Sequence, residues 1–184
     1  MDRQSVLWDL NYFKYCFLKL AHVDFLESRL EEDLQLLADD LVKYESNTFL
    51  YRDFQSRNVM VKDGEPYFID FQGGRRGPVY YDVASFVWQA KANYPDSVKE
   101  ELIASYLDSL KKYQSVDECE FRKNLNLFVL FRMIQVLGAY GYRGLFEKKK
   151  HFVESIPFAV ENVRALVEQC DFSKYSYLVS LLRD

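Results

Sequence analysis

The stretch most informative about the fold runs from residue 51 to residue 72 and reads YRDFQSRNVMVKDGEPYFIDFQ. Short runs of β-branched and aromatic residues are separated here by turn residues, which predicts three short strands, at 48–51, 58–62 and 67–70. Asp63-Gly64 is a strong hairpin signal between the second and third strands. Pro66 is expected at the edge where the third strand begins. A small β element therefore lies in the middle of the chain.

Polar residues gather around this β element in a definite order. Asp53 and Asn58 stand in one loop with the spacing D-x-x-x-x-N, and Asp70 follows twelve residues after Asn58, at the end of the next strand. Such a loop beside a hairpin can bring two carboxylates and a carboxamide to one point. Mg²⁺ takes oxygen ligands and commonly uses only one or two carboxylates together with phosphate oxygens. The pattern predicts a Mg²⁺ site with a neighbouring base.

The sequence before the β element is helical in pattern. Apolar residues recur at helical spacing from Ser5 to Lys43, which predicts two helices. A break is expected near residues 22–24, with Asp24 as the cap of the second helix.

The sequence after the β element begins with a loop. Four turn formers, Gly73, Gly74, Gly77 and Pro78, predict a loop over 71–81, after which Asp82 is expected to cap a helix that runs to about Gln89. Further helices are expected at 96–113, 118–140 and 150–170, with a short one from Ser173, and Pro157 should kink or divide the helix at 150–170. The predicted fold class is α+β, mainly helical.

Length and composition limit the protein classes. The chain has 184 residues, 49% of them hydrophobic, and a net charge of −4, which suits one domain over 1–184 with a real core and excludes a large two-domain enzyme. No uninterrupted apolar run approaches 18 residues and no signal peptide is evident, so a cytoplasmic protein without a membrane span is expected. Three widely spaced cysteines, Cys16, Cys119 and Cys170, favour free thiols and make a structural zinc site improbable.

Charge is uneven along the chain. Residues 1–120 hold 14 Lys and Arg against 22 Asp and Glu, whereas residues 121–184 hold 10 against 6. The triplet Lys148–Lys150 is interpreted as a solvated helix face, too small for nucleic-acid binding. Three glycines spaced three apart, Gly138, Gly141 and Gly144, are expected to serve close packing.

The motifs resemble those of the aminoglycoside phosphotransferase/choline kinase group, a family of protein-kinase-like small-molecule kinases. The resemblance rests on Tyr51–Asn58, Ile69–Phe71 and Tyr81–Ala84, and their wording is most similar to that of bacterial kinases of cell-wall amino sugars, including N-acetylmuramate. Residues 136–140 are loosely similar to a helix of those proteins.

The resemblance implies roles for individual residues. Asp53 matches the base that accepts the proton of the acceptor hydroxyl, and Asn58 and Asp70 match the Mg²⁺ ligands that bridge the phosphates of ATP. The resemblance assigns support of the catalytic loop to Tyr51, Arg52 and Asp82, but for Asp82 the structural role of an N-cap is the favoured interpretation. Substrate contacts are expected from Gln55, Arg57, Gln72, Tyr81, Trp88 and Arg143. Tyr51 departs from the pattern, because the family has His there, but Tyr supplies both aromatic packing and a hydroxyl.

A second departure concerns the amino-terminal lobe that kinases of this fold use to cover the nucleotide phosphates. Only 52 residues precede Asp53, and none of them is Gly. The chain is therefore expected to be a carboxy-terminal lobe, weakly active or inactive alone, whose partners are an acceptor and a missing lobe supplied in cis or in trans.

The acceptor and the activity leave alternatives open. The net charge of +4 over residues 121–184 favours a neutral or anionic sugar over a polycation. A non-catalytic binding or regulatory module is the second interpretation, and a structural helical domain with chance motifs is the third.

Overall fold

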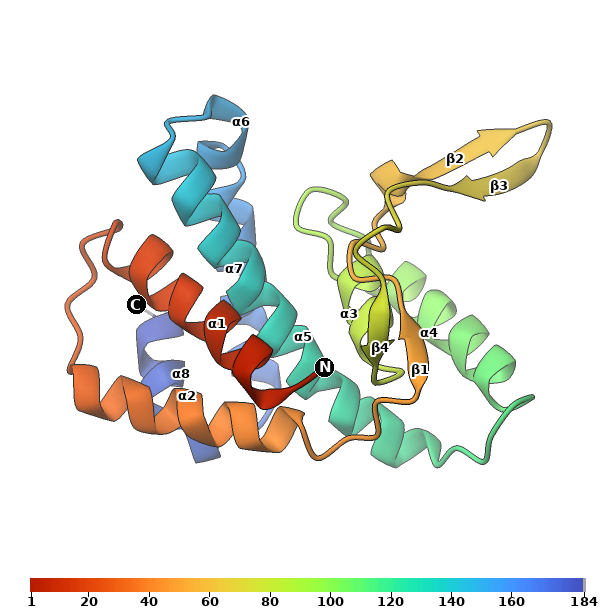
Figure 1. Ribbon diagram of the computed structural model, residues 1–184, viewed down its shortest axis with the longest axis horizontal. Helices are drawn as coiled ribbons and strands as arrows, with labels where there is room; N and C mark the ends of the chain where they lie inside the picture. Colours follow the sequence, from red (N-terminus) through yellow and green to blue (C-terminus); the bar gives the residue numbers. More distant parts are fainter. Residues whose placement is uncertain (184) are drawn as a thin grey trace. The chain divides into compact units, whose positions relative to one another are not determined.

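The structure is a computed structural model that describes residues 1–183, and the chain divides into two compact units. Unit 1 comprises residues 1–44 and the chain from Leu130 onward, and unit 2 comprises residues 45–129. The long helix α5 (Glu118–Tyr140) has residues in both units. The predicted mainly helical α+β class is confirmed (Figure 1).

The amino-terminal part of unit 1 holds two helices, as predicted. α1 (Arg3–Phe13) begins with a capping box between Asp2 and Ser5 and continues as the π-helix η1 (Lys14–Leu18), and α2 (Glu27–Leu41) follows after a break. The expected cap at Asp24 is wrong. α2 begins after Leu26, which provides no side-chain cap, so helix formation here depends on the buried face of α2.

The carboxy-terminal part of unit 1 consists of short helices after α5. These are the π-helix η3 (Gly141–Phe146), α6 (Lys150–Val153), α7 (Ile156–Gln169), the short η4 (Ser173–Tyr175) and α8 (Ser176–Arg183). Pro157 lies in the first turn of α7 and divides the predicted helix at 150–170, as expected, because proline is tolerated only where no helical N–H bond is needed.

Close packing of α1 and η1 against α5 and η3 depends on glycine. A Cβ placed on Gly138 would lie 3.0 Å from the backbone nitrogen of Phe13, and one on Gly141 would lie 2.0 Å from the carbonyl oxygen of Cys16. Both obstacles are backbone atoms, which cannot turn aside. The predicted packing role of these glycines is confirmed.

Two carboxylates of α2 hold the end of the chain. Asp33 accepts a hydrogen bond from the backbone N–H of Leu178 at 2.8 Å, in the first turn of α8, and is 8% exposed. Asp40, also 8% exposed, accepts hydrogen bonds from Lys43, Lys174 and the hydroxyl of Tyr175. The last two helices therefore attach to α2 through polar contacts as well as through apolar ones.

Among the described residues, the helix over Glu118–Phe146 is long and apolar enough to cross a membrane by length and composition. No helix of this length and composition was predicted from the sequence. Of its most apolar stretch, 56% is buried within the protein. Buried core helices share this composition.

Unit 2 contains the β element. β1 (Thr48–Leu50) pairs antiparallel with β4 (Arg75–Gly77), and β2 (Val59–Lys62) pairs antiparallel with β3 (Glu65–Phe68) in a hairpin. The expectation of loop throughout 71–81 is wrong at β4. The sequence Arg-Arg-Gly carries no strand signal, and the strand forms because Gly77 lies against Leu50 of β1, where a Cβ would come within 2.0 Å of the leucine side chain.

The β2–β3 hairpin has the turn that the sequence predicts. Asp63 and Gly64 both have positive φ, 53° and 82°, as a two-residue hairpin turn requires. Pro66 is the second residue of β3 and pairs with Val61; the missing N–H is tolerated because both strands of this ribbon are edges. Figure 1 shows the hairpin projecting from the rest of unit 2.

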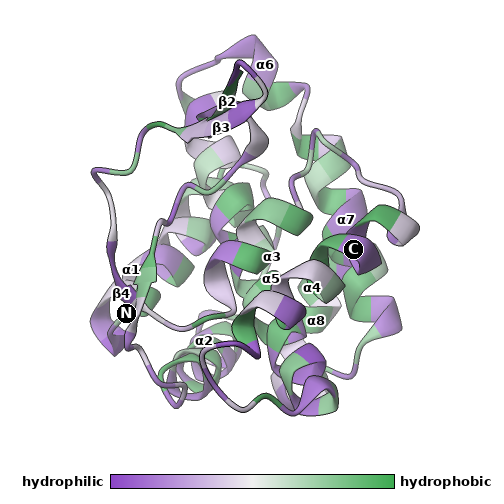
Figure 2. Cartoon of the chain, turned by 90° about the vertical axis from the view of Figure 1, so that its right-hand side faces the viewer, coloured by the Kyte–Doolittle hydropathy of each residue, from purple (hydrophilic) through white to green (hydrophobic). Residues whose placement is uncertain are grey.

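Two helices pack beside the strands. α3 (Tyr81–Val87) follows β4, and α4 (Asp96–Leu110) packs against α3. Hydrophobic and hydrophilic residues alternate along the helices (Figure 2), and the core of unit 2 includes Leu50, Val83 and Ile103. This core supports the loop between β1 and β2.

The charge difference between the two parts of the sequence does not carry over to the units. Unit 1 holds 13 Lys and Arg against 15 Asp and Glu, and unit 2 holds 11 against 13, so each has a net charge of −2. The acidic residues 1–44 and the basic carboxy-terminal residues belong to the same unit. The electrostatic argument for a neutral or anionic acceptor therefore has no basis in the units.

Candidate active site

The loop that follows β1 is held from below by Asp82. The backbone N–H groups of Tyr51 and Arg52 donate to the two oxygens of its carboxylate, at 2.6 and 2.9 Å. Asp82 lies in the first turn of α3, but the N-cap residue is Tyr80, so the expectation that Asp82 caps this helix is wrong. Arg52 has φ of 77°, a backbone conformation that is rare outside glycine. The carboxylate fixes the loop at this strained residue.

Asp53 stands at the centre of a hydrogen-bonded cluster. Gln55 donates to one carboxylate oxygen at 2.7 Å, and Arg57 donates to the other at 2.8 Å. The side-chain nitrogen of Asn58 donates both to this second oxygen and to the backbone carbonyl of Asp53. The side chain of Asp53 remains 35% exposed. These three side-chain donors hold the Asp53 carboxylate in one orientation.

The hairpin connects this cluster to Asp70. The backbone N–H of Ile69 donates to the carbonyl of Asn58 at 3.0 Å, which continues the β2–β3 register by one more pair. Asp70 is the next residue, exposed and with φ of 66°. Asn58 and Asp70 therefore lie at the same, open end of the hairpin, with Asp53 bonded to Asn58.

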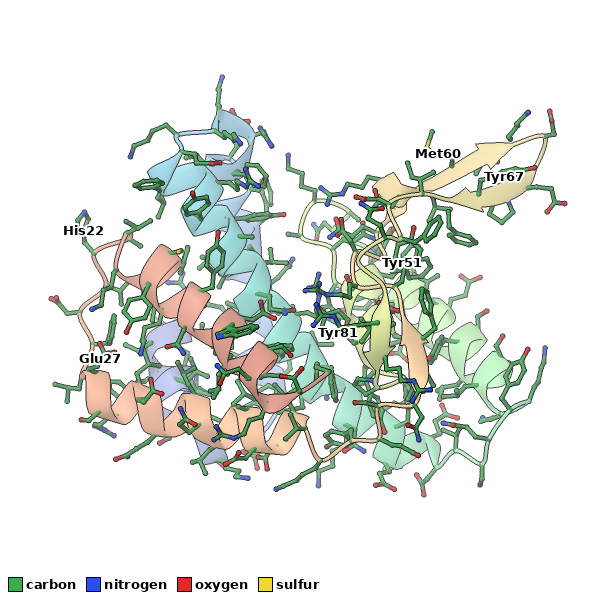
Figure 3. All side chains as sticks on the ribbon, in the orientation of Figure 1. His22, Glu27, Tyr51, Met60, Tyr67 and Tyr81 are labelled. Atoms are coloured by element: carbon green, nitrogen blue, oxygen red, sulfur yellow. The ribbon has the colours of Figure 1, made fainter. Side chains whose placement is uncertain are left out.

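Tyr51 experiences the charges of three carboxylates. Desolvation raises the pKa of its hydroxyl, and the negative charges of Asp70, Asp53 and Asp82 raise this pKa further. The Tyr51 hydroxyl donates to the carbonyl of Ile69. Figure 3 shows Tyr51 between the hairpin and the lower strands of unit 2. This tyrosine thus joins the loop to the strand that precedes Asp70.

The oxygen donors of the site fit Mg²⁺. Asn58 is 6% exposed, and its side-chain nitrogen makes the two hydrogen bonds to Asp53, which leaves its side-chain oxygen available as a ligand. Gln72 donates to one oxygen of Asp70, which holds that carboxylate in place. One carboxamide and one carboxylate form a small oxygen donor set, suited to a cation that keeps water and phosphate ligands. No cluster of three His, Cys, Asp or Glu that could hold a metal occurs in residues 1–183.

The predicted substrate residues take different places. Gln55, Arg57 and Gln72 all bond the carboxylates of the site. Trp88 is half-buried at the end of α3. Tyr81 is only 3% exposed, which leaves it almost no surface for an acceptor to contact. Arg143 belongs to unit 1, where it pairs with Glu147 at 3.1 Å.

Sequence reasoning missed one residue of this loop. The side-chain oxygen of Gln89 accepts hydrogen bonds from both the backbone N–H and the hydroxyl of Ser56, at 3.0 and 2.9 Å. Its own nitrogen donates to the carbonyl of Phe86. Nothing in the sequence around residue 89 signals this contact, because it depends on where α3 ends.

A D-x-x-x-x-N loop tied to a helix, next to a hairpin that ends in a further Asp, is the arrangement that protein kinases use for phosphoryl transfer. The comparisons with known proteins agree on this class. The family described as the phosphotransferase enzyme family (APH) matches residues 3–119, more than half of the chain. The chain belongs to this family.

Curated relatives give a narrower comparison. An N-acetylmuramate/N-acetylglucosamine kinase of Neisseria meningitidis serogroup B is 26% identical over 113 residues, which cover 60% of this chain and 34% of the relative. The enzyme of the same name from Pseudomonas putida is 23% identical over 143 residues, covering 76% of this chain and 42% of the relative. The chain thus spans less than half the length of these relatives. The resemblance to amino-sugar kinases is confirmed at this level.

Proposed function

We propose that this chain is the carboxy-terminal catalytic lobe of an ATP- and Mg²⁺-dependent phosphotransferase that acts in the cytoplasm. It would move the γ-phosphoryl group of ATP to a hydroxyl of a sugar or amino sugar. The observation that carries the proposal is the meeting of Asp53, Asn58 and Asp70 at the open end of the β2–β3 hairpin. The amino-sugar acceptor is supported by the names of the curated relatives.

Each residue of the site has a defined task in this proposal. Asp53 accepts the proton of the acceptor hydroxyl, and Asn58 and Asp70 hold Mg²⁺ through their side-chain oxygens. Bound Mg²⁺-ATP supplies the transferred group and neutralises the charge of its phosphates. Arg57 is 64% exposed, so its side chain can leave Asp53 when an acceptor hydroxyl needs the carboxylate oxygen.

We further propose that an amino-terminal lobe, in cis or in trans, completes the enzyme. The hairpin that carries the site exposes apolar side chains on both faces, with Val61 74% and Tyr67 54% exposed. Figure 3 shows Met60 and Tyr67 on this projecting hairpin. An apolar ribbon of this kind commonly marks an interaction site. Phosphoryl transfer relies on positioned charges around the phosphates, so the lobe alone should be weakly active or inactive.

The metal assignment is tested by calorimetry with Mg²⁺-ATP. Asp70→Ala should weaken binding to the chain by about tenfold or more, since it removes the only carboxylate assigned to the metal. Asp96→Ala is the matched control, because Asp96 lies in unit 2 and its side chain is 91% exposed. Equal binding by wild type and Asp70→Ala would refute the metal assignment.

The base assignment needs the chain joined to an amino-terminal lobe and a panel of sugars. Asp53→Asn should lower kcat by about 10²–10⁴-fold, the usual contribution of a general base, while leaving nucleotide binding in place. Wild-type turnover in this variant would refute the role of Asp53. Nucleotide binding by the joined protein without any turnover would instead favour the non-catalytic binding module.

A further inference from the structure

A concave site lies in unit 2. It is a cavity of about 630 Å³ bounded by β1, the loop after it, β3, the segment before α3, and α4. Volumes of 300–1,000 Å³ are typical of sites that bind small molecules. None of Asp53, Asn58 and Asp70 lines this cavity, whereas Tyr51 and Asp82 do, so it lies beside the candidate active site.

Aromatic and apolar side chains dominate the lining. Half-buried Val79 and Tyr106 lie among the less exposed residues of the wall. Phe49, Phe68 and Phe71 are 69%, 48% and 58% exposed and form the rim. Aromatic rings at an open rim can pack against both faces of a planar ligand.

The polar groups of the cavity are already engaged. The hydroxyl of Thr48 donates to the carbonyl of Gly77 at 2.7 Å, and the hydroxyl of Tyr106 donates to the carbonyl of Val79 at 2.8 Å. The only ionisable acid in the lining is Asp82, whose carboxylate accepts the two N–H groups of the catalytic loop. No Lys or Arg lines the cavity. An anionic ligand would therefore find no partner, and a neutral one would lose no hydrogen bond.

From this lining we propose that the cavity binds a neutral, planar aromatic small molecule. The site is adjacent to the candidate active site through shared residues. Phe71 follows Asp70 directly, and Tyr51 stands two residues before Asp53 in the loop that Asp82 holds. A ligand packed against Phe71 and Tyr51 restrains the two segments that carry Asp53 and Asp70. The inference is independent of phosphoryl transfer, since it rests on the cavity alone.

The test uses N-phenyl-1-naphthylamine, a neutral aromatic probe whose fluorescence rises in apolar sites. The wild-type chain should bind it saturably. Val79→Phe fills the wall and should weaken binding by about tenfold or more, and Phe71→Ala removes a rim ring and should weaken it by about three- to tenfold. Phe158→Ala is the control, because Phe158 is 51% exposed on α7 in unit 1, and its affinity should stay within about twofold of wild type.

Several results would overturn the proposal. The first is that the wild-type chain shows no saturable binding of the probe. The second is that Phe158→Ala weakens probe binding as much as the cavity variants do, and the third is that Val79→Phe or Phe71→Ala leaves the affinity for the probe unchanged. Circular dichroism shows whether Val79→Phe folds. If this variant does not fold, Phe71→Ala at the exposed rim decides the test alone.

Competitive displacement of the probe by Mg²⁺-ATP would show that the cavity is part of the nucleotide site and would overturn the proposal. Loss of probe binding in a chain joined to an amino-terminal lobe would make the cavity a lobe contact. Probe binding that is retained both with Mg²⁺-ATP present and in the joined chain supports a separate aromatic site.

Discussion

At the scale of single residues, Asp82 is the structural support of the loop after β1. One carboxylate that accepts two backbone N–H groups, at 2.6 and 2.9 Å, holds Tyr51 and Arg52 in place. Asp82→Asn keeps one acceptor oxygen and replaces the other with a donor, which faces an N–H. We expect the free energy of unfolding to fall by about 1.5–3 kcal/mol, the range for a hydrogen bond to a charged group.

Urea unfolding of Asp82→Asn beside Asp96→Asn measures this effect. Asp96 also lies in the first turn of a helix, α4, but its side chain is 91% exposed and pairs only with Lys99. The control should change stability by no more than about 0.5 kcal/mol. Equal losses in the two variants would contradict the support role of Asp82.

Single residues also show how far sequence reasoning reaches. The Asp63-Gly64 turn predicts the hairpin register, and the structure confirms that this register brings Asn58 beside Ile69, the residue before Asp70. A shared site of Asp53, Asn58 and Asp70 stays a prediction. The contacts of Gln89 with Ser56 could not be predicted in this way. They depend on tertiary packing of α3, which leaves no local pattern.

At the scale of elements, helices and strands with a long local sequence pattern are predicted well, and those that depend on tertiary contacts are not. The helix at 118–140 was predicted to the residue, because its apolar pattern is long. β4 was missed, since a three-residue strand of Arg-Arg-Gly exists only through its pairing with β1. The break predicted near residues 22–24 is confirmed, but the start of α2 differs from the one predicted at Asp24, because the helix begins after Leu26 without any capping side chain.

Contact between the two π-helical segments gives a prediction about elements. Gly141→Ala places a methyl group 2.0 Å from the carbonyl oxygen of Cys16, so η1 and η3 must separate. We expect a loss of about 1–3 kcal/mol or more, as for other overpacked cores. Thermal unfolding should show a clear drop in Tm, whereas Gly73→Ala, which meets nothing within 4 Å, should leave Tm nearly unchanged. A Gly141→Ala variant as stable as wild type would refute the close approach.

Attachment of η4 to α2 predicts a pH dependence. Burial would raise the pKa of Asp40, but hydrogen bonds from Lys174, Lys43 and Tyr175 outweigh it and lower the pKa from 3.8 to about 2. A lowered pKa means that the ionised form stabilises the fold above about pH 4, and that this stability is lost as pH falls toward 2. The loss should reach about 2 kcal/mol, since one pKa unit corresponds to about 1.4 kcal/mol.

Urea unfolding at pH 6, 4 and 3 tests this dependence. Asp40→Asn should be less stable than wild type at pH 6, and its stability should change less between pH 4 and pH 3, because the titrating group is gone. Asp96→Asn is the control, because the side chain of Asp96 is 91% exposed. If the free energy of unfolding of Asp40→Asn changed with pH as steeply as that of wild type, the lowered pKa of Asp40 would not be the cause of the pH dependence.

At the scale of the whole molecule, the two units change how the charge of the chain is understood. Each carries a net charge of −2, so net charge does not distinguish the units and gives no reason to favour an anionic acceptor over a cationic one. Acceptor choice must then come from contacts at short range. The prediction of one kinase-like lobe over 1–184 stays a prediction, since the family match covers residues 3–119.

The exposed hairpin leads to a prediction about association. Val61 and Tyr67 present large apolar surfaces on opposite strands, and both strands have free edges. Exposed apolar edge strands promote association of identical chains. The chain should therefore self-associate with rising concentration. The double variant Val61→Lys, Tyr67→Lys should be monomeric, because charge on an edge strand opposes pairing.

Light scattering coupled to gel filtration measures the molecular mass of each variant. Phe158→Lys on α7 is the control for an exposed apolar residue elsewhere. Two outcomes would show that the hairpin is not the self-association surface: a wild-type chain that stays monomeric at all concentrations, or a Phe158→Lys variant that dissociates as much as the hairpin variant. Either outcome would also weaken the case for a lobe that covers the hairpin.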